Sequence, residues 1–196
     1  MASQTDICNQ ALTKIGADRI LAITDDTKAA STLNAIWAIK RDAELAAQPW
    51  TFAIRRASLP ASTTTPSFGW SYAYPLPSDY LAMVEVGEDY AFYTGDPQPL
   101  FALEGGEVLT DQGSPLNIRY VSRVTNTGLY PALFAEALAC RLAAELCERM
   151  TQSGPKREAA WAEHKKAIRE ARRVNAIEQP PRNIPPGSWE RALLDC

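Results

Sequence analysis

The sequence predicts an α+β protein in which a small β domain is inserted between two pairs of helices. Helical periodicity at both ends, short strand-like runs between turn residues in the middle, and the clustering of 14 prolines outside the helical segments support this prediction. We expect residues 1–48 and 130–175 to form a four-helix bundle domain. Residues 49–129 would form an inserted antiparallel β-sandwich or barrel domain, and residues 176–196 an extended C-terminal tail.

The first helix is predicted over residues 4–15, where apolar side chains recur on one face. Ser3 or Thr5 can cap its start, and Gly16 stands where a helix would end. The second helix is predicted to start at Thr24-Asp25-Asp26 and to run to about Ala47. It stops before Pro49, because the residue preceding a proline is pushed out of helical geometry. The two aspartates are therefore interpreted as a helix cap rather than as a metal site.

The middle of the chain contains many short strand-like runs. Residues 50–54 alternate like a strand, and further strands are predicted at 72–74, 81–86, 90–94, 101–103, 108–109 and 118–124. Gly105-Gly106 suits a hairpin turn. Short strands with regularly spaced turns are typical of a small sandwich or barrel.

The C-terminal run from Pro131 to Asn175 is the strongest helical signal, and it breaks at Ser153-Gly154-Pro155. The first half is rich in Ala and Leu, which predicts a helix buried inside a bundle. Residues 155–175 carry seven basic against three acidic side chains, a net charge of +4, which predicts a helix on the outside. Residues 59–128 carry eight acidic side chains against two arginines, a net charge of −6. This uneven distribution would help to orient subunits or partners.

The sequence offers little catalytic chemistry. His164 is the only histidine, which excludes multi-histidine metal sites, and its helical spacing with Ala160, Ala167, Ala171 and Val174 predicts a half-buried helix residue. Walker A, GxGxxG and GxSxG motifs are all absent. We therefore expect no catalytic, cofactor-binding or metal-binding residues.

A polysaccharide hydrolase is the alternative interpretation, because such enzymes need a pair of carboxyl groups and aromatic rings that stack on sugars. The candidate acids lie in or beside turns, and the candidate rings lie in the same region. The acids are Glu85, Glu88, Asp89, Glu104 and Glu107, and the rings are Trp70, Tyr72, Tyr74 and Tyr90.

The four cysteines show no disulfide pattern: Cys8, Cys140 and Cys147 occupy apolar helix positions, and Cys196 is the last residue. The N-terminal residues lack the shape of a signal peptide, and no apolar run reaches membrane-spanning length. We expect synthesis in a reducing cytoplasm and no association with a membrane.

Five stretches in this order resemble one protein family. They are ICNQALTKIG at 7–16, PWTFAIRR at 49–56, YAYPLPSDYL at 72–81, LACRLAAELCERMT at 138–151 and AIREARR at 167–173. The chain resembles the head-to-tail adaptor, or tail tubular protein A, family of short-tailed (podovirus-type) bacteriophages. The resemblance depends on the order and spacing of the five stretches, and the PWTF and LPSDY motifs are the most specific of them.

The resemblance implies a structural virion protein without enzymatic activity or cofactors. Such adaptors form a ring, in the family a dodecamer, beneath the portal protein. They connect the capsid to the tail nozzle (tubular B-type) protein or tail fibres, and DNA passes through the channel without sequence-specific binding. The protein would be located in the tail or neck of the virion, and in the host cytoplasm during assembly. The alternatives are a tail-associated hydrolase of cell-wall or capsule polysaccharide and a DNA-binding factor that uses the basic fourth helix.

Two groups of residues are candidate contacts with the portal or a neighbouring subunit. The first is the set of exposed cations on the last helix, and the second is a set of apolar residues that an isolated tail cannot bury. They are Lys165, Lys166, Arg169, Arg172 and Arg173, and Trp189, Leu193 and Leu194. Packing of the tail on its own subunit is an equally good interpretation of the second set.

Overall fold

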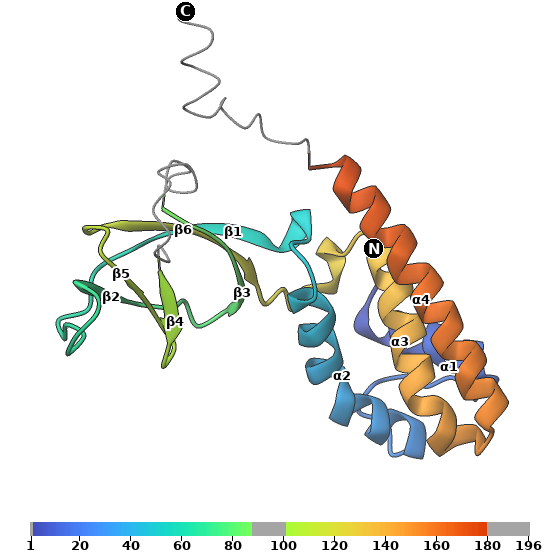
Figure 1. Ribbon diagram of the computed structural model, residues 1–196. Coiled ribbons are helices and arrows are strands. Elements are labelled where there is room, and N and C mark those ends of the chain that lie inside the picture. Colours follow the sequence, from blue (N-terminus) through green and yellow to red (C-terminus); the bar gives the residue numbers. More distant parts are fainter. Residues whose placement is uncertain (1, 88–100, 180–196) are drawn as a thin grey trace, which may run out of the picture.

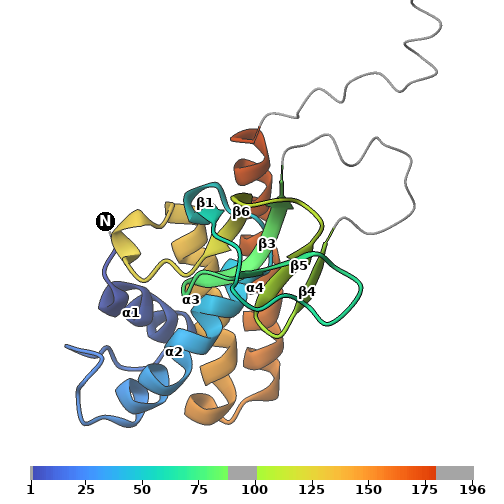
Figure 2. The same ribbon diagram turned by 90° about the vertical axis from the view of Figure 1, so that its left-hand side faces the viewer.

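The computed structural model describes residues 2–87 and 101–179, and it confirms a mixed α+β fold (Figure 1). Helices α1 and α2 precede the strands, and helices α3 and α4 follow them. Figure 1 shows the strands at one end of the molecule and the helices at the other, and in the perpendicular view the strands lie in front of α3 and α4 (Figure 2). The helices are α1 (Gln4–Ile15), α2 (Lys28–Ala46), α3 (Ala132–Thr151) and α4 (Gly154–Ile177).

Helix α1 has the predicted bounds, and both of its ends have an identifiable cause. The Ser3 hydroxyl accepts a hydrogen bond from the backbone N–H of Asp6 at 3.1 Å, and the Asp6 carboxylate accepts one from the N–H of Ser3 at 2.8 Å. This reciprocal pair is a capping box. Gly16 ends the helix at φ 73°, a left-handed conformation that favours glycine.

Helix α2 begins later than predicted, at Lys28, because Thr27 is its N-cap. The Thr27 hydroxyl accepts a hydrogen bond from the N–H of Ala30 at 3.1 Å. The prediction that Asp25-Asp26 cap this helix is wrong. The Asp25 carboxylate instead accepts hydrogen bonds from the N–H groups of Leu21 and Ala22, at 2.7 and 3.0 Å, and closes the turn before the helix.

Helix α3 is the central helix of the helical part and packs against α1, α2 and α4. It is buried along most of its length and ends at Gln152, which has a positive φ of 52°. Helix α4 continues to Ile177, two residues beyond the predicted end at Asn175. It buries only one stripe of side chains, so the prediction of a buried helix followed by an outer one is confirmed.

The strands form two separate antiparallel sheets of three strands each, in the orders β1-β6-β3 and β2-β5-β4. The sheets do not close into a barrel. Side chains from both sheets nevertheless share one hydrophobic cluster, which includes Tyr74 and Val108 from one sheet and Ile118 and Tyr120 from the other. The strands are β1 (Ile54–Leu59), β2 (Tyr72–Pro75), β3 (Tyr80–Val86), β4 (Ala102–Glu104), β5 (Glu107–Thr110) and β6 (Leu116–Ser122).

The predicted strand at 50–54 is wrong, because residues Thr51–Ala53 form a 3₁₀ turn in which Ala53 N–H donates to the Trp50 carbonyl at 2.9 Å. The predicted strand at 90–94 lies outside the described residues. Gly105 and Gly106 do form the turn of the β4–β5 hairpin, with φ values of 58° and 86°.

An aromatic cluster joins the helices to the strands. Trp50 and Phe52 lie with Tyr130 and Phe134, and their ring centroids are 4.9–6.3 Å apart in the contacting pairs. The Tyr130 hydroxyl donates to the carbonyl of Val124 at 2.7 Å. Burial raises the pKa of Tyr130 to about 12. The PWTF motif therefore anchors the start of the strands in the helical core.

The LPSDY turn also has a structural role at this junction, where Asp79 makes three polar contacts. Its carboxylate accepts from Tyr120 at 2.9 Å and from Arg55 at 3.2 Å, and its carbonyl accepts from the Arg123 N–H at 2.6 Å. The Arg123 side chain donates in turn to Asp42 on α2 at 2.9 Å. A polar chain therefore runs from the turn to the helices.

Among the described residues, no helix is long and apolar enough to cross a membrane. Cys8, Cys140 and Cys147 are buried thiols, and Cys196 lies outside the described residues. Burial raises the pKa of Cys8 to about 12, so this thiol stays protonated and packs as an apolar group.

We expect Phe134→Ala to destabilise the chain by about 3–5 kcal/mol, because it removes a ring that is 1% exposed and contacts three other aromatic rings. Urea denaturation followed by circular dichroism measures the loss. The matched control is Phe68→Ala, where the ring is 88% exposed, and its cost should stay within about 0.5 kcal/mol. Equal costs for the two variants would contradict the placement of the aromatic cluster.

Candidate assembly surface on helix α4

Helix α4 presents different chemistry on different faces. His164, Ile168, Ala171 and Asn175 are buried, at spacings of four, three and four residues that place them on one stripe. All five predicted cations on this helix are exposed. At 100° per residue they occupy a continuous face away from the buried stripe. We call this face the basic strip, and its members are Lys165, Lys166, Arg169, Arg172 and Arg173.

The basic strip has no acidic partner within the described part of the chain: none of its five side chains takes part in an ion pair there. Other charges of the same helix are paired. Glu163 pairs with Lys14 of α1, and Arg157 pairs with Glu148 of α3 at 2.5 Å. The strip is therefore an uncompensated positive surface, which attracts acidic groups of another molecule.

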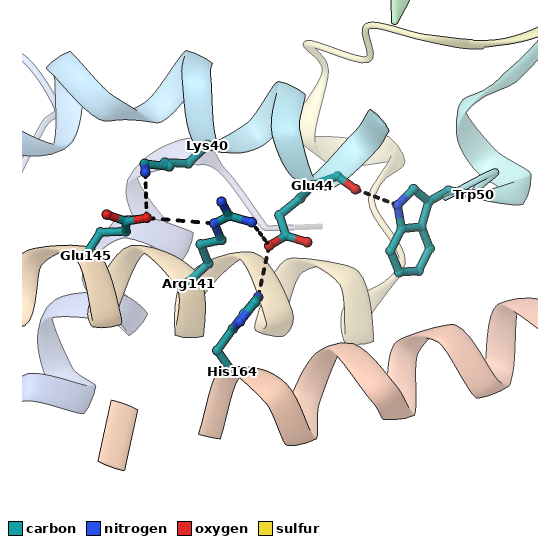
Figure 3. A network of polar contacts seen from close by, with 6 residues as sticks. All are labelled: Lys40, Glu44, Trp50, Arg141, Glu145 and His164. Carbon is teal, nitrogen blue, oxygen red and sulfur yellow. Dashed lines mark hydrogen bonds and ion pairs between the residues drawn. The ribbon is translucent and has the colours of Figure 1, made fainter. Parts of the chain in front are cut away.

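A buried polar network holds α4 in place from its inner side (Figure 3). The Glu44 side chain of α2 is only 2% exposed. Its Oε1 accepts a hydrogen bond from Arg141 of α3 at 2.7 Å and lies 2.9 Å from Nε2 of His164 of α4. One carboxylate therefore ties three helices together.

The network extends from Glu44 in two directions (Figure 3). The Nε atom of Arg141 lies 4.0 Å from Glu145, and that carboxylate pairs with Lys40 at 2.5 Å. The backbone carbonyl of Glu44 accepts a hydrogen bond from the Trp50 indole at 2.9 Å. The polar network and the aromatic cluster at the junction thus meet at one residue.

The protonation of Glu44 reflects opposing effects. Burial by itself would raise the pKa of this carboxyl, because it penalises the charged form. Hydrogen bonds from His164 and Arg141, together with the electrostatic attraction of these two groups, outweigh burial and lower the pKa of Glu44 below its usual range. Glu44 is therefore a carboxylate near neutral pH.

The C-terminal end of α4 is fixed to the PWTF motif. Asn175 accepts a hydrogen bond from the N–H of Thr51 at 2.8 Å and donates to the carbonyl of Pro49 at 3.2 Å. The Thr51 hydroxyl donates to Glu178 at 2.9 Å, and Gln179 donates to Pro49 at 2.7 Å. Helix α4 is thus held at its middle by His164 and at its end by Asn175. The basic strip lies on the opposite, solvent-exposed face of the helix.

An apolar cavity of about 180 Å³ lies beside this end of α4. Its wall includes Trp50, Leu133, Phe134 and Val174, and Glu178 stands at its edge. The predicted contacts Trp189, Leu193 and Leu194 lie outside the described residues, so their place relative to the cavity stays a prediction.

The acids and rings of the hydrolase hypothesis do not gather around one cleft in the described residues. Glu85 pairs with Arg119 at 2.7 Å. Tyr74 is fully buried and its hydroxyl donates to the carbonyl of Gln112, so this ring cannot stack on a sugar. Glu104 and Glu107 face each other across the β4–β5 hairpin. Glu88, Asp89 and Tyr90 lie outside the described residues, while Trp70 is partly and Tyr72 well exposed.

In the described part of the chain, no group of three or more His, Cys, Asp or Glu side chains is placed to hold a metal ion. His164 lies on a helix, as predicted, but it is buried and not half-buried. Its edge also packs against Trp161, with ring centroids 5.6 Å apart.

Sequence reasoning missed Glu44, Arg141 and Asn175. A signal for Glu44 was present: Ala30, Leu33 and Trp37 lie on a helical stripe that continues through position 44 and places this carboxylate among buried residues. A buried charge requires a partner. The identity of that partner was not visible, since Arg141 and His164 lie about 100 residues away in the sequence.

Comparison with models of known protein families and with curated proteins finds no match to this sequence. The resemblance to head-to-tail adaptors therefore rests on the motifs and on their order along the chain.

We expect Glu44→Gln to destabilise the protein by about 2–4 kcal/mol at neutral pH, because Arg141 and His164 would lose the carboxylate that they share. The measurement is urea denaturation. The control is Glu148→Gln, which breaks the exposed pair with Arg157 and should cost less than about 1 kcal/mol.

A comparison of wild type with Glu44→Gln at different pH values tests how the contribution of Glu44 to stability depends on pH. A carboxyl group with a lowered pKa in the folded state stabilises the fold above its unfolded pKa of about 4.3, and this stabilisation is lost as pH falls through the folded pKa. The gap between wild type and Glu44→Gln should therefore shrink below about pH 4. A gap that is unchanged or larger in acid would contradict this account of Glu44.

Proposed function

We propose that this chain is a structural virion protein, a head-to-tail adaptor of a short-tailed bacteriophage that acts by assembly and not by catalysis. The four helices would form a bundle that carries residues 49–129 as a β-sandwich domain. The chain would assemble as a ring, as a dodecamer in the virion, under the portal protein. The ring would hold the tail nozzle (tubular B-type) protein or tail fibres and let DNA pass to the exit.

The observation that carries this proposal is the basic strip, an uncompensated charged face on an outer helix that is anchored at two points. A helix whose backbone is already fixed loses little backbone entropy when it binds. The described polar groups beneath it are occupied in holding helices together and do not surround a cleft. This arrangement favours a docking surface over an active site.

Ring geometry gives a second line of support. A closed ring uses heterologous interfaces, so each subunit needs two different and complementary surfaces. The chain has a basic helix at one end, and the strands lie at the other, where the β4–β5 hairpin carries the carboxylates of Glu104 and Glu107 (Figure 1). The protein would reside in the host cytoplasm during assembly and then in the neck of the virion.

We predict that the purified chain forms rings when it is mixed with the portal protein of its own phage, as seen by electron microscopy. The triple variant Lys165→Glu/Arg169→Glu/Arg172→Glu should reduce ring formation by about tenfold or more, because it reverses the charge of the basic strip. The control is Arg19→Glu/Arg149→Glu/Lys156→Glu, which makes the same change in net charge at exposed positions elsewhere.

Three results would contradict the adaptor. A wild-type chain that stays monomeric and does not bind the portal would refute it directly. DNA binding that weakens steeply with salt, and that only the strip variant loses, would favour the DNA-binding factor. Turnover of cell-wall or capsule polysaccharide by the purified chain would favour the hydrolase.

A further inference from the structure

The tip of the β4–β5 hairpin carries two carboxylates that form no ion pair with any described residue. Glu104 and Glu107 are directly opposite partners on the two antiparallel strands, on either side of Gly105-Gly106. Neither has an ion-pair partner within the described residues. Like charges at directly opposite positions of a strand pair destabilise it, so a nearby cation would relieve this tip.

Other acids of the strand region differ from these two. Asp79 accepts hydrogen bonds from Tyr120 and Arg55, Glu85 pairs with Arg119, and Asp111 accepts from Ser71. The charges of Asp79 and Glu85 are balanced by arginines of the same subunit, and Asp111 is a single carboxylate that neutral Ser71 hydrogen-bonds. Among the described residues of the strand region, the hairpin tip therefore carries two adjacent carboxylates that are free to bind another molecule. We call Glu104 and Glu107 the acidic tip.

The acidic tip cannot reach the basic strip of its own chain. The hairpin lies at the far end of the strands, and α4 lies on the opposite side of the helices (Figure 1). The perpendicular view agrees, since the hairpin is then near the viewer and α4 lies behind it (Figure 2). Two copies placed head to tail can make the contact that one copy cannot.

We propose that the basic strip of one copy docks on the acidic tip of the next copy. This inference rests on the proposed ring and names one of its subunit contacts. Because strip and tip are different surfaces at opposite ends, the contact is heterologous, and every copy can both give and receive it. The partner of the strip is thus a second copy of this chain, and charge complementarity selects it.

The contact would mainly determine the order and orientation of the subunits, and it would contribute little to the free energy that holds them together. Ion pairs between exposed side chains are individually weak, and salt screens them. Complementary charges mainly increase the rate of association and exclude wrong orientations. The contact therefore suits subunits that associate weakly and transiently in solution and form a stable ring when the portal brings them together.

Charge exchange tests this contact. The tip variant Glu104→Lys/Glu107→Lys and the strip variant Lys165→Glu/Arg169→Glu should each reduce ring formation on the portal by about tenfold. The chain that carries all four substitutions should return to within about threefold of wild type, because the attraction is restored with the signs exchanged. Two lysines at the tip repeat the original repulsion, so the hairpin itself should be little affected.

The controls separate this contact from a general effect of charge. Asp26→Lys/Glu158→Lys changes two other exposed acids and should assemble like wild type. Circular dichroism should show that all variants are folded. If either double variant assembles normally, or if the fourfold variant is as defective as the double variants, the proposed contact is wrong.

A second measurement does not need the portal. Equal amounts of ¹⁴N- and ¹⁵N-labelled wild-type chain are treated with a carbodiimide, which joins a lysine amine to a carboxylate that touches it. Mixed-isotope links from Lys165 or Lys166 to Glu104 or Glu107 are expected. If such links form but the chain makes no rings on the portal, the contact between strip and tip is supported and the adaptor function is refuted. If rings form on the portal but the links are absent and the fourfold variant does not recover, the adaptor function is supported and the contact is refuted.

Discussion

The arrangement of the helices depends on one buried carboxylate. Glu44 is surrounded by apolar side chains and would be costly there alone, yet Arg141 of α3 and His164 of α4 both contact the same oxygen atom. The contact between Glu44 and His164 also fixes the rotation of α4 about its own axis, because only one face of the helix carries the histidine. The backbone carbonyl of Glu44 receives the Trp50 indole, so the carboxylate and the start of the strands are linked through one residue.

Once the rotation of α4 is fixed, the direction of its charges follows from helical geometry. Residues one, five and eight positions after His164 point away from the core, and all three are cations: Lys165, Arg169 and Arg172. Asn175 prevents the end of the helix from moving by binding the backbone at Pro49 and Thr51. A buried side-chain network therefore determines which face of α4 is presented for the proposed assembly, and it fixes the helix backbone before any partner binds.

Local patterns in the sequence predicted the parts of the fold that depend on neighbouring residues. The Ser3 cap, the break near Gly154 and the Gly105-Gly106 hairpin are of this kind. Segment 50–54 was mispredicted because tertiary contacts decide its shape: its alternating pattern fits a strand, but Trp50 and Phe52 both enter the aromatic cluster of the helical core. The basic strip could be read from helical spacing, whereas its lack of ion-pair partners required the three-dimensional arrangement. The partners of Glu44 are too distant in sequence for any local rule.

The central claim is that α4 faces the core with one side and another subunit with the opposite side. Lysine acetylation, read by mass spectrometry before and after assembly on the portal, tests it most directly. Lys165 and Lys166 belong to the basic strip, whereas Lys156 is exposed on the other flank of the same helix. The account predicts that assembly slows the acetylation of Lys165 and Lys166 and leaves that of Lys156 unchanged. Unchanged reactivity of all three lysines in an assembled ring would contradict it.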